Sequence, residues 1–161
     1  MSQIIYTLSR ILFATILLSL TTGCARRTIP MEDYVRPIVT SKSTQGVVYL
    51  TASGYARRKG DAKQEALRRA IEEVMFRGIP NSNVKRPLIN EPGARAKHER
   101  YFKRFFSDGG PYTDYGKILN INPFQTIRYK RGYQVFVDVE VNYAQLQRDL
   151  ERAGIISKFG I

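Results

Sequence analysis

The sequence predicts an α+β fold, in which a small antiparallel or mixed sheet is covered mainly on one face by two or three helices. Three observations predict this class. Residues 46–56 are rich in β-forming side chains, and residues 61–77 repeat apolar residues at helical spacing. Residues 133–141 place a tyrosine or a valine at every second position, as a half-buried strand does. Strands and helices grouped in this way along a chain are typical of α+β domains.

The first expected strand is GVVYLTASGYA, residues 46–56. Its alternating faces hold Val47, Tyr49 and Thr51 on one side, and Val48, Leu50 and Ala52 on the other. Glycine inside a strand often marks a bulge or an end. We therefore expect Gly54 to end this strand or to form a bulge in it.

The strongest helical pattern covers residues 61–77. Asp61 is a good N-cap, and Gln64 three places later completes a capping-box pattern. Glu65 and Arg69 form an ion pair in the favourable order, and Gly78 stops the helix. The apolar positions, which we expect to face the sheet, are Ala62, Ala66, Leu67, Ala70, Ile71, Val74 and Met75.

A second helix is predicted within residues 93–110, after an irregular stretch at 79–93 that contains three prolines. One side carries an aromatic stripe made of His98, Tyr101, Phe102, Phe105 and Phe106. Basic residues surround this stripe, namely Arg95, Lys97, Arg100, Lys103 and Arg104. Two interpretations stay open. The helix binds an anionic partner or membrane surface, or it packs its aromatic side on the core and leaves its basic side in water.

The third helix and the remaining strands lie in the last third of the chain. Residues 124–129 and 133–141 are expected to form a hairpin that turns at Lys130-Arg131-Gly132. A short strand is expected at 117–121. The segment 142–154 is a predicted helix that Asn142 caps and Gln145 supports by capping-box spacing, with Leu146 and Leu150 facing inward.

The amino-terminal residues 1–23 have the features of a secretory signal peptide. Arg10 precedes an apolar run at 11–20, and small residues end the segment. The run is short for a bilayer-spanning helix, which needs ~20 apolar residues. An uncleaved anchor over residues 4–22 is the alternative.

The segment LLSLTTGCARR ends this run with the chain's single cysteine, Cys24. Thr22-Gly23-Cys24 resembles the bacterial lipobox, although that motif normally has leucine where this sequence has Thr21. The resemblance implies cleavage before Cys24, a diacylglycerol on its sulfur, and an acyl chain such as palmitate on the new amino terminus. More than one lipid chain gives stable membrane anchoring. A cysteine with no such role is the alternative, and a disulfide within the chain is excluded.

The domain organisation follows from this start. We expect residues 24–45 to be a tether, 46–155 the folded domain and 156–161 a carboxy-terminal tail. Ala25, which is not acidic, implies through the lipoprotein resemblance an outer-membrane anchor that faces the periplasm. Loss of residues 1–23 removes one charge, Arg10, and lowers the net charge from +12 to +11. The high positive charge of this exported domain favours anionic partners.

The two expected strands and their helix also carry a resemblance to a family. VVYLTASGYARRKGDAKQEALRRAIEEV and the later strand from Tyr133 resemble LPP20-type lipoproteins and the amino-terminal domain of the flagellar protein FlgT. The similarity covers residues 46–77 and 125–153, and the basic-aromatic insertion at 78–117 departs from it. The resemblance implies an envelope lipoprotein or a part of an envelope machine, and it brings no catalytic residue.

Residues suited to catalysis or metal binding are sparse. His98 is the only histidine, and a zinc site needs three or four ligands. Asp138 and Glu140 share a strand face, which we interpret as the solvated side of the sheet. We therefore expect no enzyme, cofactor or metal, and a non-enzymatic structural or assembly component that contacts envelope proteins or a second copy of itself. The alternative is a periplasmic binding module for an anionic lipid or polymer; for an exported lipoprotein, nucleic acid is not the expected partner.

Overall fold

The structure is a computed structural model that describes residues 35–37 and 45–157, without the side chains of 35–37 and 121–125. The predicted signal peptide, Cys24 and most of the predicted tether and tail therefore lie outside the described residues. Within the described ranges, the domain has four strands and four α-helices, in the order expected of an α+β fold.

The sheet is antiparallel throughout, with the strand order β1-β2-β4-β3. Its strands are β1 (Val35–Pro37), β2 (Val48–Ala56), β3 (Gly116–Tyr129) and β4 (Gly132–Val141). β2 pairs with β4 along its full length, from Val48 opposite Val141 to Ala56 opposite Tyr133. The predicted α+β class with a small antiparallel sheet is thus confirmed.

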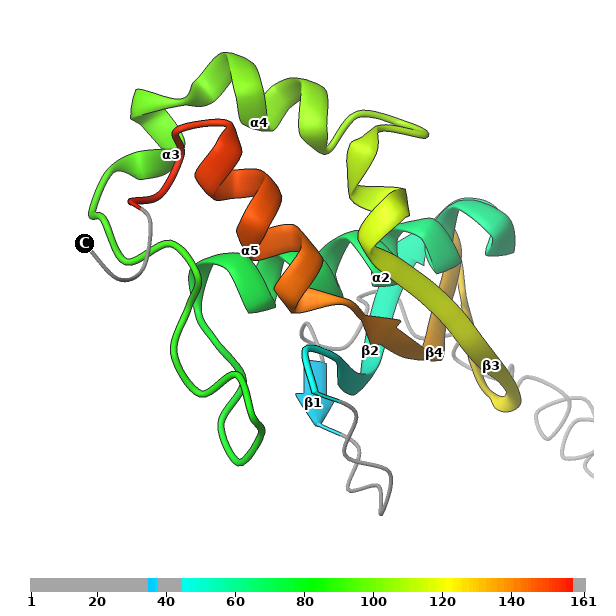
Figure 1. The fold of residues 1–161 in the computed structure, drawn as a ribbon. Coiled ribbons are helices and arrows are strands. Elements are labelled where there is room, and N and C mark those ends of the chain that lie inside the picture. Colours follow the sequence, from blue (N-terminus) through cyan, green and yellow to red (C-terminus); the bar gives the residue numbers. More distant parts are fainter. Residues whose placement is uncertain (1–34, 38–44, 158–161) are drawn as a thin grey trace, which may run out of the picture.

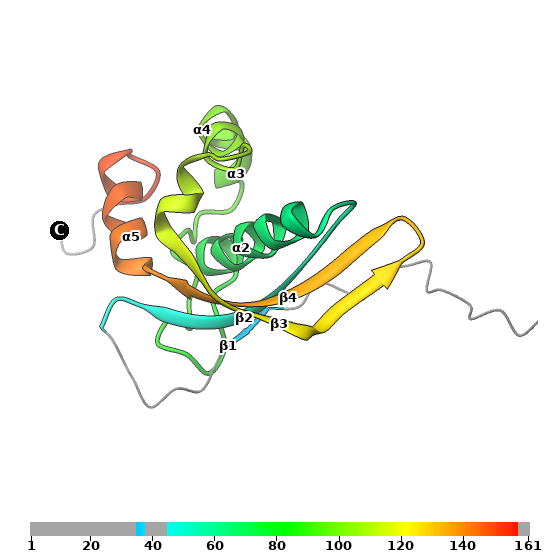
Figure 2. The same ribbon diagram turned by 90° about the vertical axis from the view of Figure 1, so that its right-hand side faces the viewer.

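The helices lie on one face of this sheet (Figures 1 and 2). They are α2 (Lys59–Phe76), α3 (Ala94–Lys97), α4 (Glu99–Phe105) and α5 (Tyr143–Arg152), with a 3₁₀ turn, η1, at Pro111–Tyr115. Figure 2 shows α2 directly on the sheet and α3 and α4 on the far side of α2. The basic-aromatic segment is therefore a second layer of helix, which packs on α2 and on η1.

The contact between α2 and β2 is unusually close because its residues are small. Ala62, Ala66 and Ala70 are fully buried in the core. A Cβ atom at Gly54 would lie 2.1 Å from the carbonyl oxygen of Ala62 and 2.3 Å from the nitrogen of Ala66. The expected strand end or bulge at Gly54 is wrong, because the pairing with β4 continues without a shift to Ala56. The glycine serves instead to let the helix backbone approach the strand.

The start of α2 also differs from the prediction. The helix begins at Lys59, and its N-cap, Arg58, makes no side-chain capping bond. Asp61 lies within the first turn, where a carboxylate still interacts favourably with the positive end of the helix dipole. The capping box expected from Asp61 is therefore absent. The predicted pair of Glu65 and Arg69 is present at 3.0 Å, and Arg68 joins the same carboxylate at 2.6 Å.

The second half of the fold follows the prediction more closely. Asn142 caps α5, since its Oδ1 accepts a hydrogen bond from the backbone nitrogen of Gln145 at 3.0 Å. The hairpin turns at residues 130–131, between Tyr129 and Gly132. The two strands expected at 117–121 and 124–129 are one strand, β3, which keeps pairing with β4 across register shifts.

The Gly54 contact can be tested with two glycine-to-alanine substitutions. Gly54→Ala is expected to lower the free energy of unfolding by about 3 kcal/mol or more, because two backbone atoms of α2 would have to move. Gly60→Ala, in the first turn of α2 with no atom within 4 Å of the new Cβ, should be neutral or more stable by up to about 1 kcal/mol. Urea unfolding of both variants measures the difference. Equal stabilities would contradict the close contact.

Candidate functional site

The basic-aromatic segment forms two short helices rather than the single helix expected. The helical pattern breaks at His98, whose φ of −113° and ψ of 32° are not helical. α3 precedes this residue and α4 follows it. In α3, Arg95 lies against α2, whereas α4 packs its aromatic rings on α2 and η1.

The aromatic stripe belongs to the core. Phe102 and Phe105 are 4% and 2% exposed. Phe102 packs edge-on against Phe76 of α2, with ring centroids 5.3 Å apart, and Phe105 stacks on Tyr115 at 5.7 Å. The interpretation in which the aromatic side packs inward is confirmed for these two rings. They are not exposed to insert into a membrane or to stack on a base.

Two of the five predicted basic residues are neutralised within the chain. Arg95 pairs with Glu72 of α2 and lies over the ring of Phe76, 4.7 Å from its centroid. Lys97 donates a hydrogen bond to Glu91 at 2.8 Å, and this bond lowers the pKa of the Glu91 carboxyl. These two side chains help to hold α3 in place.

The other three basic residues have no such partner. Among the described residues, no carboxylate lies within ion-pair distance of Arg100, Lys103 or Arg104. All three are exposed. The structure therefore divides the predicted set into two residues that stabilise the fold and three that present charge to solvent.

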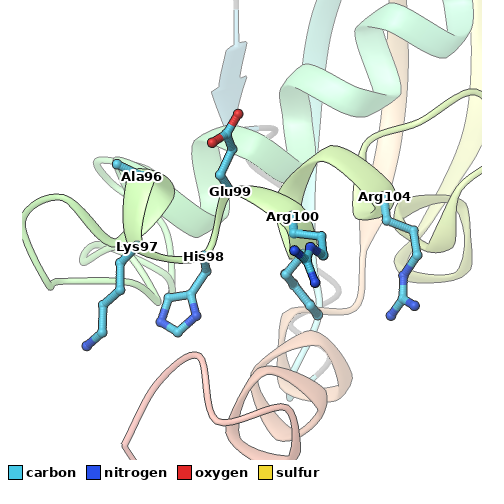
Figure 3. Close-up of a pocket in the computed structure, with 7 residues that line it drawn as sticks. Ala96, Lys97, His98, Glu99, Arg100 and Arg104 are labelled. Atoms are coloured by element: carbon cyan, nitrogen blue, oxygen red, sulfur yellow. The ribbon is translucent and has the colours of Figure 1, made fainter.

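A groove of about 640 Å³ runs along α3 and α4, and its described lining is Ala96, Lys97, His98, Glu99, Arg100, Tyr101 and Arg104. Figure 3 shows Lys97, His98, Arg100 and Arg104 extending to the same side, towards α5, whereas Glu99 points the opposite way. Lys103 does not line this groove. The only histidine of the chain thus lies between cations on one surface.

Beside this groove, an acidic residue of α5 is already occupied. Tyr115 donates a hydrogen bond to Asp149 Oδ2 at 2.9 Å. The buried Oδ1 forms an ion pair with Arg152, 2.6 Å from its Nη2. Burial and then the bond to Asp149 raise the pKa of Tyr115, and burial followed by the charge of Asp149 raises the pKa of Tyr101. Both phenols stay neutral at ordinary pH.

Of the two acidic residues predicted on the solvated face of the sheet, Asp138 has a structural partner. Thr51 donates a hydrogen bond to Asp138 at 2.8 Å across the outer face of the sheet, where Glu140 also lies half-buried. Gln134, on the same face, is unexpectedly buried, and it bonds to Tyr129 at 2.9 Å and to Ser53 at 3.3 Å. The alternating pattern alone placed Gln134 on a solvated face and gave no sign of this network.

A second cavity, of about 670 Å³, lies between the start of α2 and the loop that joins α4 to η1. Asp61, Glu65 and Arg68 of α2 line it together with Asp108. The sequence gave no indication of it, because Asp108 comes from a separate segment. Glu65 is bound by Arg68, whose pKa this bond raises. The charge that remains there is acidic.

Metal binding and membrane spanning have no structural support within the described residues. No cluster of three or more histidine, cysteine, aspartate or glutamate side chains suited to a metal ion occurs among them. None of the helices in the described part of the chain has the length and apolarity needed to cross a membrane.

Comparison with protein-family models, with curated proteins and with solved structures gives no match to this chain. The resemblances at Cys24 and at residues 46–77 and 125–153 therefore stay predictions.

Removal of one hydroxyl tests the contact between η1 and α5. Tyr115→Phe should lower the free energy of unfolding by about 1 kcal/mol, because it takes a donor from a carboxylate that is largely buried. Tyr143→Phe is the matched control, since that hydroxyl lies 3.5 Å from Asn83 in an exposed contact, and the change should stay within about 0.5 kcal/mol. Thermal or urea unfolding distinguishes the two. A control as destabilised as Tyr115→Phe would refute the assignment.

The raised tyrosine pKa values predict a loss of stability in alkali. The folded state holds the protons of Tyr101, Tyr112 and Tyr115 more tightly than the unfolded chain, whose phenols ionise near pH 10. Their contribution is complete below about pH 10 and is lost as the pH rises above it. In urea unfolding from pH 9 to 11, stability should fall less steeply for Tyr115→Phe than for the wild type. Parallel curves for the two proteins would contradict this.

Proposed function

We propose that this protein is a lipid-anchored component of a bacterial cell envelope. Cys24 carries the lipid in the outer membrane, and the folded domain at 46–155 faces the periplasm and acts by binding other envelope components or a second copy. The observation that carries this proposal is the cysteine itself, which stands directly after a short apolar run and the small residues Thr22 and Gly23.

The arrangement of the acidic residues supports a binding role over a catalytic one. Glu65 is held by Arg68 and Arg69, and Asp149 by Tyr115 and Arg152. Each of these carboxylates joins neighbouring parts of the fold or successive turns of a helix. Side chains used in this way have a sufficient structural reason to be charged, so no reaction is needed to explain them.

A second candidate function is a binding module for an anionic lipid or polymer. The observation that favours it is the set of Arg100, Lys103 and Arg104, which are exposed without an acidic partner among the described residues. The two functions are compatible, because a lipid anchor restricts a domain to the neighbourhood of a membrane without specifying its partner.

Intact-mass spectrometry of the protein extracted from bacterial membranes tests the anchor. The wild-type chain is expected to begin at Cys24 and to carry the added mass of a diacylglycerol and an acyl chain, and Cys24→Ala should lose this mass. Thr21→Leu restores the residue that the lipobox normally has, so it should be processed at least as completely as the wild type. An unprocessed or unlipidated wild-type chain would refute the proposal.

A further inference from the structure

The groove along α3 and α4 gathers positive charge on one side of the domain. Lys97, Arg100 and Arg104 line it together with His98, and Figure 3 shows these four side chains pointing to the same side. Arg100 and Arg104 are four residues apart on α4, where like charges repel and destabilise a helix. On their own helix this repulsion is offset only for Arg104, which lies in the last turn near the negative end of the helix dipole.

Nearby acids do not compensate this charge. Glu99 belongs to the lining but points away from the four side chains in Figure 3. Asp149 of α5 is engaged by Tyr115 and Arg152. Of the groove's cations, Lys97 alone has a carboxylate partner in the described part of the chain, Glu91, and that pair is exposed to solvent. The groove thus retains at least two uncompensated guanidinium groups.

The chemistry of these groups identifies a ligand class. A guanidinium presents paired N–H donors in a planar fork that matches two phosphate oxygens, and lysine adds a point charge. His98 and Tyr101 supply further polar groups along the same lining. We propose that this groove binds a phosphate group, specifically the phosphodiester of an anionic lipid headgroup.

The choice of a lipid as the source of the phosphate rests on the proposed function, since an anchor on Cys24 would hold the domain close to a membrane. A volume of about 640 Å³ is within the range of small-molecule sites and accommodates a headgroup. The buried positions of Phe102 and Phe105 argue against insertion into the acyl chains. The headgroup alone is therefore the expected ligand.

The binding experiment uses the full chain with Cys24→Ala, in nonionic detergent, so that its outcome does not depend on lipidation. The probes are glycerophosphoglycerol, which is the headgroup of phosphatidylglycerol without its acyl chains, and inorganic phosphate. Backbone amide signals in ¹⁵N NMR, which every variant keeps, report binding, and the arginine side-chain Nε–H signals of the parent chain locate it on Arg100 and Arg104. The test variant is Arg100→Gln with Arg104→Gln. The matched control is Arg57→Gln with Arg86→Gln, which removes two exposed arginines that do not line the groove.

The test variant is expected to raise the dissociation constant for glycerophosphoglycerol by about tenfold or more, because it removes charge-assisted hydrogen bonds. The control should change it by less than about threefold, as expected for a screened, longer-range effect. Arg100→Lys with Arg104→Lys keeps the charge and loses the forks, so it should give an intermediate value. Thermal unfolding of each variant verifies that it is folded.

The remaining outcomes also decide the proposal. Binding of inorganic phosphate alone would overturn the lipid source. Equal losses in the test and control variants would show diffuse attraction to a basic protein and overturn the site, as would no binding by the parent chain. Failure of the lipid anchor appears separately, in the intact mass of the wild-type protein.

Discussion

The close approach of α2 to the central strand pair determines where the second layer of helix, α3 and α4, lies. Gly54 lets the backbone of α2 approach β2 more closely than any side chain would permit. The alanines that face it, Ala62 and Ala66, are fully buried. Two sheet strands and one helix are thereby joined in a single apolar layer. Because protein interiors are close-packed, a change of one methyl group at this contact affects the whole layer.

The outer face of α2 then positions the basic-aromatic segment. The ring of Phe102 packs on Phe76, and the guanidinium of Arg95 lies over the same Phe76 ring. Arg95 also forms an ion pair with Glu72. The groove on α3 and α4 is therefore connected to Gly54 indirectly: Gly54 contacts one face of α2, and α3 and α4 pack on the opposite face. Substitutions at the sheet contact would disturb the groove without touching it, which is why the groove should be tested with variants on its own surface.

The parts of this fold that the sequence predicts correctly are those determined by local periodicity. The valines of β4 and the apolar face of α2 repeat at 2.0 and 3.6 residues, and the structure buries both sets. The errors concern features that depend on tertiary contacts. Neither the helix break at His98 nor the role of Gly54 in close packing can be read from neighbouring residues. Asp61 is not the cap because α2 starts almost a full turn earlier, with Arg58 as its N-cap.

The same limit applies to the candidate site. The sequence identifies five basic residues around an aromatic stripe. It cannot show which of them are paired with a carboxylate, because the partner of Arg95 lies 23 positions away on another helix. Once Arg95 and Lys97 are paired, the exposed charge concentrates on Arg100, Lys103 and Arg104, and two of these line one groove. Net charge alone favours anionic partners of any kind. The placement of two guanidinium forks on one side favours a ligand that accepts paired hydrogen bonds through two oxygens, as a phosphate does, and this geometric restriction separates a site from a generally basic surface.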